Sequence, residues 1–222
     1  MLLAVDTSTR MMGLSLYDGF QVLGEMTWHS HNFHTVELAP AVDNLLKRCS
    51  TEPTDLKALG VALGPGSFTG LRIGLAIIKG MSQGLNIHVI GIPTLDFLAA
   101  AQPLRDIPMV AILQAGRGRL AFRGYLAQDG NWISNEEITV LTVDELADTI
   151  EQPTLVCGEL TAEERQIITA KNKNVFLASP AHSIRRPSFL AELAWQHWKN
   201  GNIADVVSLS PIYLPTREAI EE

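Results

Sequence analysis

Apolar and polar residues follow one another along the chain in blocks that predict alternating strands and helices. Short apolar runs bounded by turn residues indicate buried strands, whereas apolar residues at helical spacing indicate amphipathic helices. Leu38, Val42 and Leu45, for example, form one helical stripe. In the first half we expect strands over Leu2–Val5, Gly13–Tyr17, Phe20–Trp28, Ala58–Leu63 and Ile87–Ile90, and helices over Thr35–Arg48, the glycine-rich segment after Ser67, and Thr94–Gln102.

The second half begins with the same order of elements as the first. Asp18-Gly19 and Asp129-Gly130 each separate two strand-like runs, which is a strong signal for a hairpin. We expect further strands over Met109–Leu113, Arg119–Tyr125, the run after Gly130, Thr154–Cys157 and Val175–Ala178, and helices over Val143–Ile150, Ala162–Lys171 and Pro187–Lys199. Such a duplication is the plan of the α/β superfamily of actin, sugar kinases and Hsp70 ATPases, whose two lobes are ribonuclease-H-like.

The expected junction between the two lobes is the segment Pro103–Pro108. It gives an N-terminal lobe over residues 1–104 and a smaller C-terminal lobe over residues 105–202. We expect the last segment, about residues 203–222, to pack back on the first lobe.

The run from Gly64 to Gly74, GPGSFTGLRIG, joins an expected strand to an expected helix that Ser67 or Thr69 caps. Each interior glycine costs a helix about 1 kcal/mol relative to alanine, so a close neighbour must offset the cost. That neighbour is either another subunit or the sheet beneath the helix. A phosphate site at the helix start is the alternative, although the run is neither a Walker A loop nor a Rossmann fingerprint.

Several segments together resemble the bacterial TsaB (YeaZ) family, a subunit of the machinery that makes threonylcarbamoyladenosine in tRNA. The segments are AVDTST near the start, HTVELAPAVDNLL, LGPGSFTGLRIG, GIPTLDFLA, and PIYL near the end. The resemblance covers nearly the whole chain and is densest over residues 1–100.

This resemblance implies a non-catalytic dimerisation subunit. Such a subunit positions and activates the paralogous catalytic subunit TsaD, which transfers threonylcarbamoyl to adenosine 37 of tRNAs that read ANN codons. The resemblance also implies a TsaE-like ATPase as partner, self-association into a homodimer, and tRNA binding only through the complex. The subunit alone is expected to bind no cofactor, with ATP or ADP at the interface of the assembled complex. The hypothetical interface comprises His34, Leu38, Val42, Gly70, Gly74, Ile77 and Met81.

Asp6, Thr7 and Ser8 end the first strand, where nucleotide-binding members of the superfamily hold a metal-bound phosphate. We interpret them as a vestigial phosphate loop, with an ordinary polar strand end as the alternative. At the matching position of the second half, Gln114-Ala115-Gly116 stands where the family usually has Asp-Ala-Arg. The missing carboxylate argues against the rival function, a small ATP-dependent kinase or ATPase. A second departure from the family lies at Pro215.

No catalytic or metal site is expected elsewhere in the chain. His29, His31 and His34 form no HExxH or helical HxxxH pair, which argues against a metallopeptidase. Arg117, Arg119 and Arg123 are expected on one face of a strand, which indicates a solvated face or a contact for RNA or an acidic partner.

Composition restricts the partners further. A net charge of −7 and a pI near 5.4 predict weak binding of tRNA by the chain alone. Two isolated cysteines, the lack of a signal peptide and the lack of a long apolar run predict a cytoplasmic protein without a membrane partner.

Overall fold

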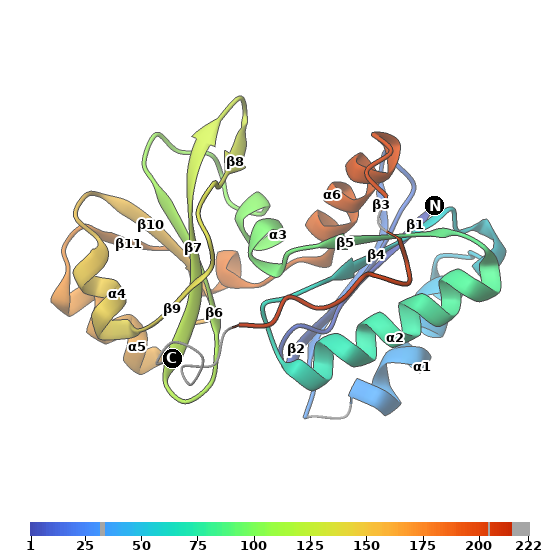
Figure 1. Ribbon diagram of the computed structural model, residues 1–222, viewed down its shortest axis with the longest axis horizontal. Helices are drawn as coiled ribbons and strands as arrows, with labels where there is room; N and C mark the ends of the chain where they lie inside the picture. The colour runs from blue at the N-terminus through green and yellow to red at the C-terminus, as the bar shows by residue number, and fades with distance from the viewer. Residues whose placement is uncertain (32–33, 204, 215–222) are drawn as a thin grey trace. The chain divides into compact units, whose positions relative to one another are not determined.

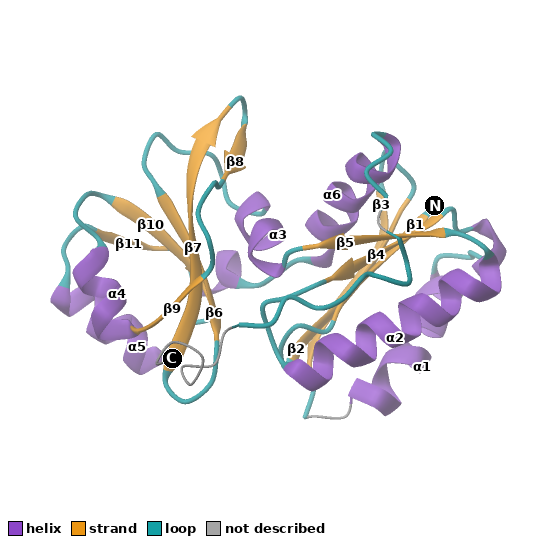
Figure 2. Cartoon of the chain, viewed as in Figure 1, coloured by secondary structure: helices purple, strands orange, loops and turns teal. Residues whose placement is uncertain are grey.

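The computed structural model describes residues 1–31, 34–203 and 205–214 and divides into two compact units. The first unit comprises Met1–Phe97 and Arg185–Pro211; the second comprises Leu98–Ile184 and the described residues from Ile212 onward. Pro215 lies outside the described residues. Each unit contains one sheet and its own helices, which Figure 1 labels and Figure 2 colours by type.

The first unit is built on a five-stranded sheet in the order β3-β2-β1-β4-β5. Strands β1, β2 and β3 pair antiparallel, and β4 and β5 extend the sheet in parallel to β1. The strands are β1 (Leu2–Asp6), β2 (Met11–Tyr17), β3 (Val22–His29), β4 (Ala58–Ala62) and β5 (His88–Ile92). The helices are α1 (His34–Arg48), α2 (Phe68–Leu85), the first residues of α3 (Thr94–Ala100), α6 (Pro187–Lys199) and the short η1 (Pro53–Asp55).

The side chains of β1 alternate between two apolar cores, one on each face of this sheet. Leu3 and Val5 face the core that α1 and α2 cover, whereas Leu2 and Ala4 face the core that α6 covers. Figure 1 shows α1 and α2 on one side of the sheet and α6 on the other. Both cores are made almost entirely of aliphatic residues, so the central strands of this sheet are buried on both faces.

The second unit repeats the plan of the first. Its sheet has the order β11-β10-β6-β7-β8, with β9 paired to β7, and it combines antiparallel β6–β7–β8 with parallel β6–β10–β11. The strands are β6 (Met109–Gln114), β7 (Arg119–Gln128), β8 (Asn131–Ile133), β9 (Thr139–Thr142), β10 (Thr154–Gly158) and β11 (Val175–Leu177). Its helices are α4 (Val143–Thr149), α5 (Ala162–Lys171) and the short η2 (Pro180–Ser183).

The boundary between the units differs from the expected one. Residues 185–202 were expected in the second lobe, but they belong to the first unit. The reason is packing: Leu190, Ala191 and Ala194 of α6 are buried in the core formed by Leu2 and Ala4. Beyond α6, Val206 and Leu209 pack against the core beneath α1 and α2, and Lys79 Nζ donates to the carbonyl of Val207 at 3.3 Å.

Candidate functional site

The end of β1 is buried, and the side chains of Asp6 and Ser8 are hydrogen-bonded within the chain, whereas the hydroxyl of Thr7 has no hydrogen-bond partner among the described residues. Asp6, Thr7 and Ser8 are at most 1% exposed. Asp6 Oδ1 accepts from the Ser8 amide at 2.8 Å, and Asp6 Oδ2 accepts from Arg185 Nε at 2.8 Å. Both carboxylate oxygens of the expected phosphate loop therefore bind the chain's own donors.

The glycine run brings the start of α2 against this loop. A Cβ on Gly66 would lie 2.2 Å from the carbonyl oxygen of Ser8, and one on Gly70 would lie 2.3 Å from that of Thr7. Only glycine fits such an approach of two backbones. The Ser67 amide donates to Ser8 O at 2.6 Å, and Ser67 Oγ caps α2 by accepting from the Gly70 amide at 3.2 Å.

These contacts favour the internal-packing interpretation of the glycine run over the phosphate interpretation. Gly74 also faces the loop, because a Cβ there would lie 2.2 Å from Thr7 Oγ1. By contrast, a Cβ on Gly80 or Gly84 would meet no atom within 4 Å. The first two glycines of the helix thus serve the packing of α2 on β1, and the last two lie on its exposed side.

At the matching place in the second unit, Gln114 ends β6 and donates two hydrogen bonds. Its Nε2 lies 3.1 Å from the carbonyl oxygen of Glu159 and 2.7 Å from Glu164 Oε2. Glu164 Oε2 also accepts from the Thr161 amide at the start of α5, at 2.7 Å. An aspartate at position 114 would lack these donors and would repel the Glu164 carboxylate. The departure from the family pattern therefore has a structural reason.

The residues of the predicted interface are largely buried within the chain. His34, Leu38 and Val42 are 7%, 0% and 6% exposed. Leu38 and Val42 belong to the core beneath α1, and His34 Nε2 lies 3.0 Å from the carbonyl oxygen of Thr9. Gly70 and Gly74 face Thr7, as described above, while Ile77 and Met81 are partly buried against the same core.

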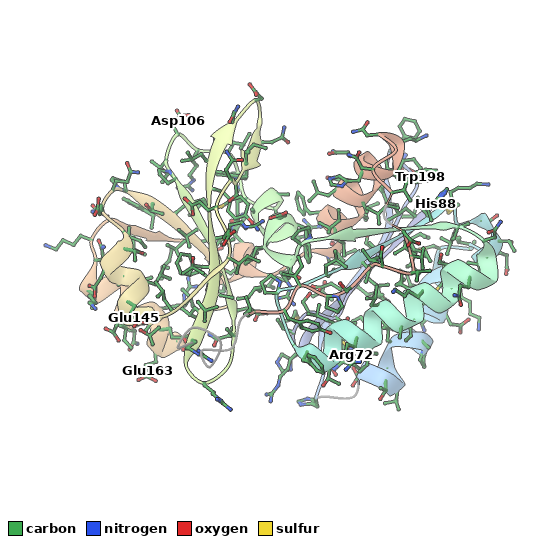
Figure 3. All side chains as sticks on the ribbon, in the orientation of Figure 1. Arg72, His88, Asp106, Glu145, Glu163 and Trp198 are labelled. Carbon is green, nitrogen blue, oxygen red and sulfur yellow. The ribbon has the colours of Figure 1, made fainter. Side chains whose placement is uncertain are left out.

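Other residues of these helices are exposed in place of the predicted ones. Val36 on α1 is 65% exposed, and Phe68 at the start of α2 is 56% exposed. Arg72, labelled in Figure 3, lies with its guanidinium carbon 4.9 Å from the centre of the Phe68 ring. Ala76 and Gly80 continue this exposed side of α2. We call Val36, Phe68, Arg72, Ala76 and Gly80 the α1–α2 surface.

A groove that the sequence did not reveal lies between β3 and α1. It has a volume of about 700 Å³, and Leu23, Met26, Pro40, Ala41, Leu45 and Cys49 line its apolar part. Gly24 permits the close packing of β3 on α1, because a Cβ there would lie 2.7 Å from both Cys49 Sγ and Leu45 Cδ1. The only feature of the sequence that indicated this groove was Gly24, an isolated glycine inside a strand.

Among the remaining candidate residues, His29 and His31 are in edge-to-face contact. The rings of His29 and His31 are 5.9 Å apart, and no cluster of three or more potential metal ligands occurs within residues 1–31, 34–203 and 205–214. Arg119 and Arg123 lie on β7, but the prediction for Arg117 was wrong: it lies in the preceding turn, with φ of 54°. Burial raises the pKa of the Cys157 thiol to about 12, so this cysteine is not a nucleophile at neutral pH.

Comparisons with known proteins agree with this architecture. A family model described as TsaD, tRNA N6-adenosine threonylcarbamoyltransferase, matches residues 22–189. The tRNA threonylcarbamoyladenosine biosynthesis protein TsaB of Bacillus subtilis is 32% identical, over 98% of this chain and 95% of that protein. Among the described helices, none is long and apolar enough to cross a bilayer.

Two solved structures support the predicted fold class. YeaZ from Pseudomonas aeruginosa is 22% identical, with a TM-score of 0.78 over 96% of this chain and 99% of that one. A hexokinase of the ROK family from Thermus thermophilus is 10% identical, with a TM-score of 0.51 over 90% and 99%. The second likeness, to a sugar kinase, confirms the actin-like α/β fold.

Proposed function

Because the chain belongs to the TsaB (YeaZ) family and takes part in tRNA threonylcarbamoyladenosine biosynthesis, we propose that it is a non-catalytic dimerisation subunit. It positions and activates a TsaD-like catalytic subunit, which transfers threonylcarbamoyl to adenosine 37 of ANN-reading tRNAs. The match to a TsaD family model supports a partner built on the same fold. Pairing of two related chains is a common route to a dimer.

One observation carries the non-catalytic part of the proposal: at the end of β1, the Asp6 carboxylate and the Ser67 amide already form hydrogen bonds within the chain. A nucleotide site of the actin-like kind needs carboxylate oxygens for a cation and free amides for phosphate. Here Asp6 binds Arg185 and Ser8, and the Ser67 amide at the helix start binds Ser8. With Gln114 in place of an acid in the second unit, this arrangement favours the partner role over a kinase or ATPase.

The α1–α2 surface is the part of the chain that we assign to the partner. It combines an exposed valine, an exposed phenylalanine with a stacked arginine, and small residues that let another helix approach. Aromatic residues and arginine are enriched at the centres of protein interfaces. The groove beside α1 extends the area available for contact.

The remaining partners and the cellular setting that we propose are those that membership of the TsaB family implies. A TsaE-like ATPase joins the complex, nucleotide binds at the assembled interface, and tRNA binds through the complex. The setting is cytoplasmic. The same surface supports a homodimer when the catalytic subunit is absent.

Co-purification with the TsaD-like subunit of the same organism tests the surface. We expect Val36→Glu and Ala76→Arg to abolish co-purification, because each places a charge on the α1–α2 surface. Leu126→Glu is the matched control, since Leu126 of β7 is 61% exposed but lies in the second unit. Binding of both surface variants at wild-type affinity would contradict the assignment, as would loss of binding by the control.

A further inference from the structure

Arg185 is among the largest fully buried side chains of the chain, at 2% exposure. Its Nε donates to Asp6 Oδ2 at 2.8 Å. Its Nη2 donates to Thr9 Oγ1 and to the carbonyl oxygen of Met11, each at 2.8 Å. A guanidinium stays charged at every accessible pH, so this position holds a permanent positive charge inside the first unit.

The atoms around this guanidinium are those that a hard cation prefers. They are a carboxylate oxygen, a hydroxyl oxygen and a backbone carbonyl oxygen, contributed by Asp6, Thr9 and Met11. Mg²⁺ and Ca²⁺ bind oxygen atoms of these types in proteins, with about six to eight ligands in all. The end of β1 and the start of β2 thus form an oxygen-lined cation site, filled by a side chain from just before α6.

The loop around this site has its own amides occupied. The Ser8 amide donates to Asp6 Oδ1 at 2.8 Å, and the Met11 amide donates to Thr9 Oγ1 at 3.2 Å. Backbone amides that bind phosphate must point at the ligand. In the folded chain, Arg185 therefore occupies the cation position beside Asp6, and the amides of Ser8 and Met11 already have hydrogen-bond acceptors.

We propose that the end of β1 is a cation site permanently occupied by the chain's own Arg185. A divalent cation or a magnesium–nucleotide complex does not bind through Asp6 in the native protein. Removal of the arginine side chain creates a vacancy with the shape and hydrogen-bond acceptors of a guanidinium ion. This inference stands independently of the partner that the α1–α2 surface binds.

Chemical rescue tests the inference. We expect Arg185→Ala to lower Tm by about 10 °C, because Asp6 is left buried without its partner charge. Millimolar guanidinium chloride should raise the Tm of this variant, whereas tetramethylammonium chloride at equal ionic strength should not. Arg186→Ala is the matched control: the neighbouring arginine bonds to Glu25 but its side chain is 54% exposed. Guanidinium should leave the Tm of the control and of the wild type unchanged.

Two results would overturn the proposal in a folded Arg185→Ala variant. One is a Tm equal to that of the wild type, and the other is a rescue no larger than that of Arg186→Ala. If Arg185→Ala does not fold, the double variant Asp6→Asn/Arg185→Met removes both charges and should melt above Asp6→Asn alone. A double variant no more stable than Asp6→Asn would contradict the assigned pair.

A calorimetric titration of the wild type with magnesium–ADP gives a test that requires no arginine variant. We expect no binding heat for either the wild type or Asp6→Asn. Saturable binding to the wild type that Asp6→Asn abolishes would overturn the proposal. This result would leave the co-purification test of the partner surface unaffected.

Discussion

At the residue scale, glycines in one helix have two different roles. Gly70 faces the backbone of Thr7, whereas Gly80 faces open space on the exposed side of α2. The sequence showed that something must offset the cost of these glycines but could not show what. The neighbour proved to be the loop after β1, which lies far away in the sequence and comes close only in the folded sheet.

We expect Gly70→Ala to destabilise the protein by about 1–3 kcal/mol, because its Cβ would overlap the Thr7 carbonyl oxygen. Gly80→Ala should stabilise it by up to about 1 kcal/mol, since alanine favours an exposed helix. Urea unfolding of the two variants measures both changes. Equal effects of the two substitutions would contradict the assigned roles.

The residue scale also explains why most residues of the predicted interface are buried within the chain. A stripe such as Leu38 and Val42 identifies the apolar face of a helix but not the molecule that covers it. In this chain the cover is the chain's own sheet. The exposed positions Val36 and Ala76 carry no pattern of their own, so sequence reasoning passed over them.

At the scale of elements, local signals located the helices well. Pro187 at the first turn and Gly201 beyond the end bound α6, whose limits agree with the expected ones. The short strand β9 was missed, because its four residues are defined by pairing with β7 rather than by their own pattern. Ser67 was one of the two expected caps of α2.

The start of α6 is attached to β3 through Glu25. Glu25 Oε1 accepts from the Ser188 amide at 3.0 Å, and Oε2 accepts from Arg186 Nη2 at 2.6 Å. Burial alone raises the pKa of Glu25, but the hydrogen bonds from Arg186 and Ser188 outweigh it and lower the pKa below its ordinary value of 4.5. The carboxylate therefore acts as a distant cap for this helix.

This lowered pKa predicts a pH dependence of stability. A carboxyl with a lowered folded pKa contributes its stabilisation above pH 4.5, and the contribution is lost as pH falls through the folded pKa. We expect Glu25→Gln to be less stable than the wild type at neutral pH, with the difference shrinking in acid. Urea unfolding across pH measures this difference, with exposed Glu137→Gln as control. Parallel curves for the wild type and Glu25→Gln would contradict the role of Glu25.

At the scale of the whole molecule, the repeat of strands was visible in the sequence, but the long-range contacts were not. Asp6 and Arg185 are separated by nearly the whole chain, and no local pattern pairs them. Separation along the sequence also explains why the boundary between the two units differs from the expected one. Helix α6 follows the second unit in the sequence but packs in the first. The return of the chain to the first lobe was expected only from about residue 203, because the local pattern of α6 does not show which sheet the helix packs on.

The net charge of −7 belongs to the whole molecule and predicts weak binding of tRNA. Neutralisation of phosphates by lysine and arginine supplies most nucleic-acid affinity, and acidic residues outnumber basic ones here. We expect the isolated chain to bind tRNA weakly and without sequence preference at physiological salt, and more tightly in the complex. Filter binding over a range of salt concentrations measures both states. Tight binding by the isolated chain would contradict this expectation.

The most direct test of the central claim is a tRNA modification assay with purified subunits of the same organism, from which each subunit is omitted in turn. We predict that threonylcarbamoyl transfer to adenosine 37 requires both this chain and the TsaD-like subunit. We also predict that this chain alone hydrolyses no ATP and transfers no group. Undiminished modification in its absence would contradict the account, as would ATP hydrolysis by the isolated chain that Asp6→Asn abolishes.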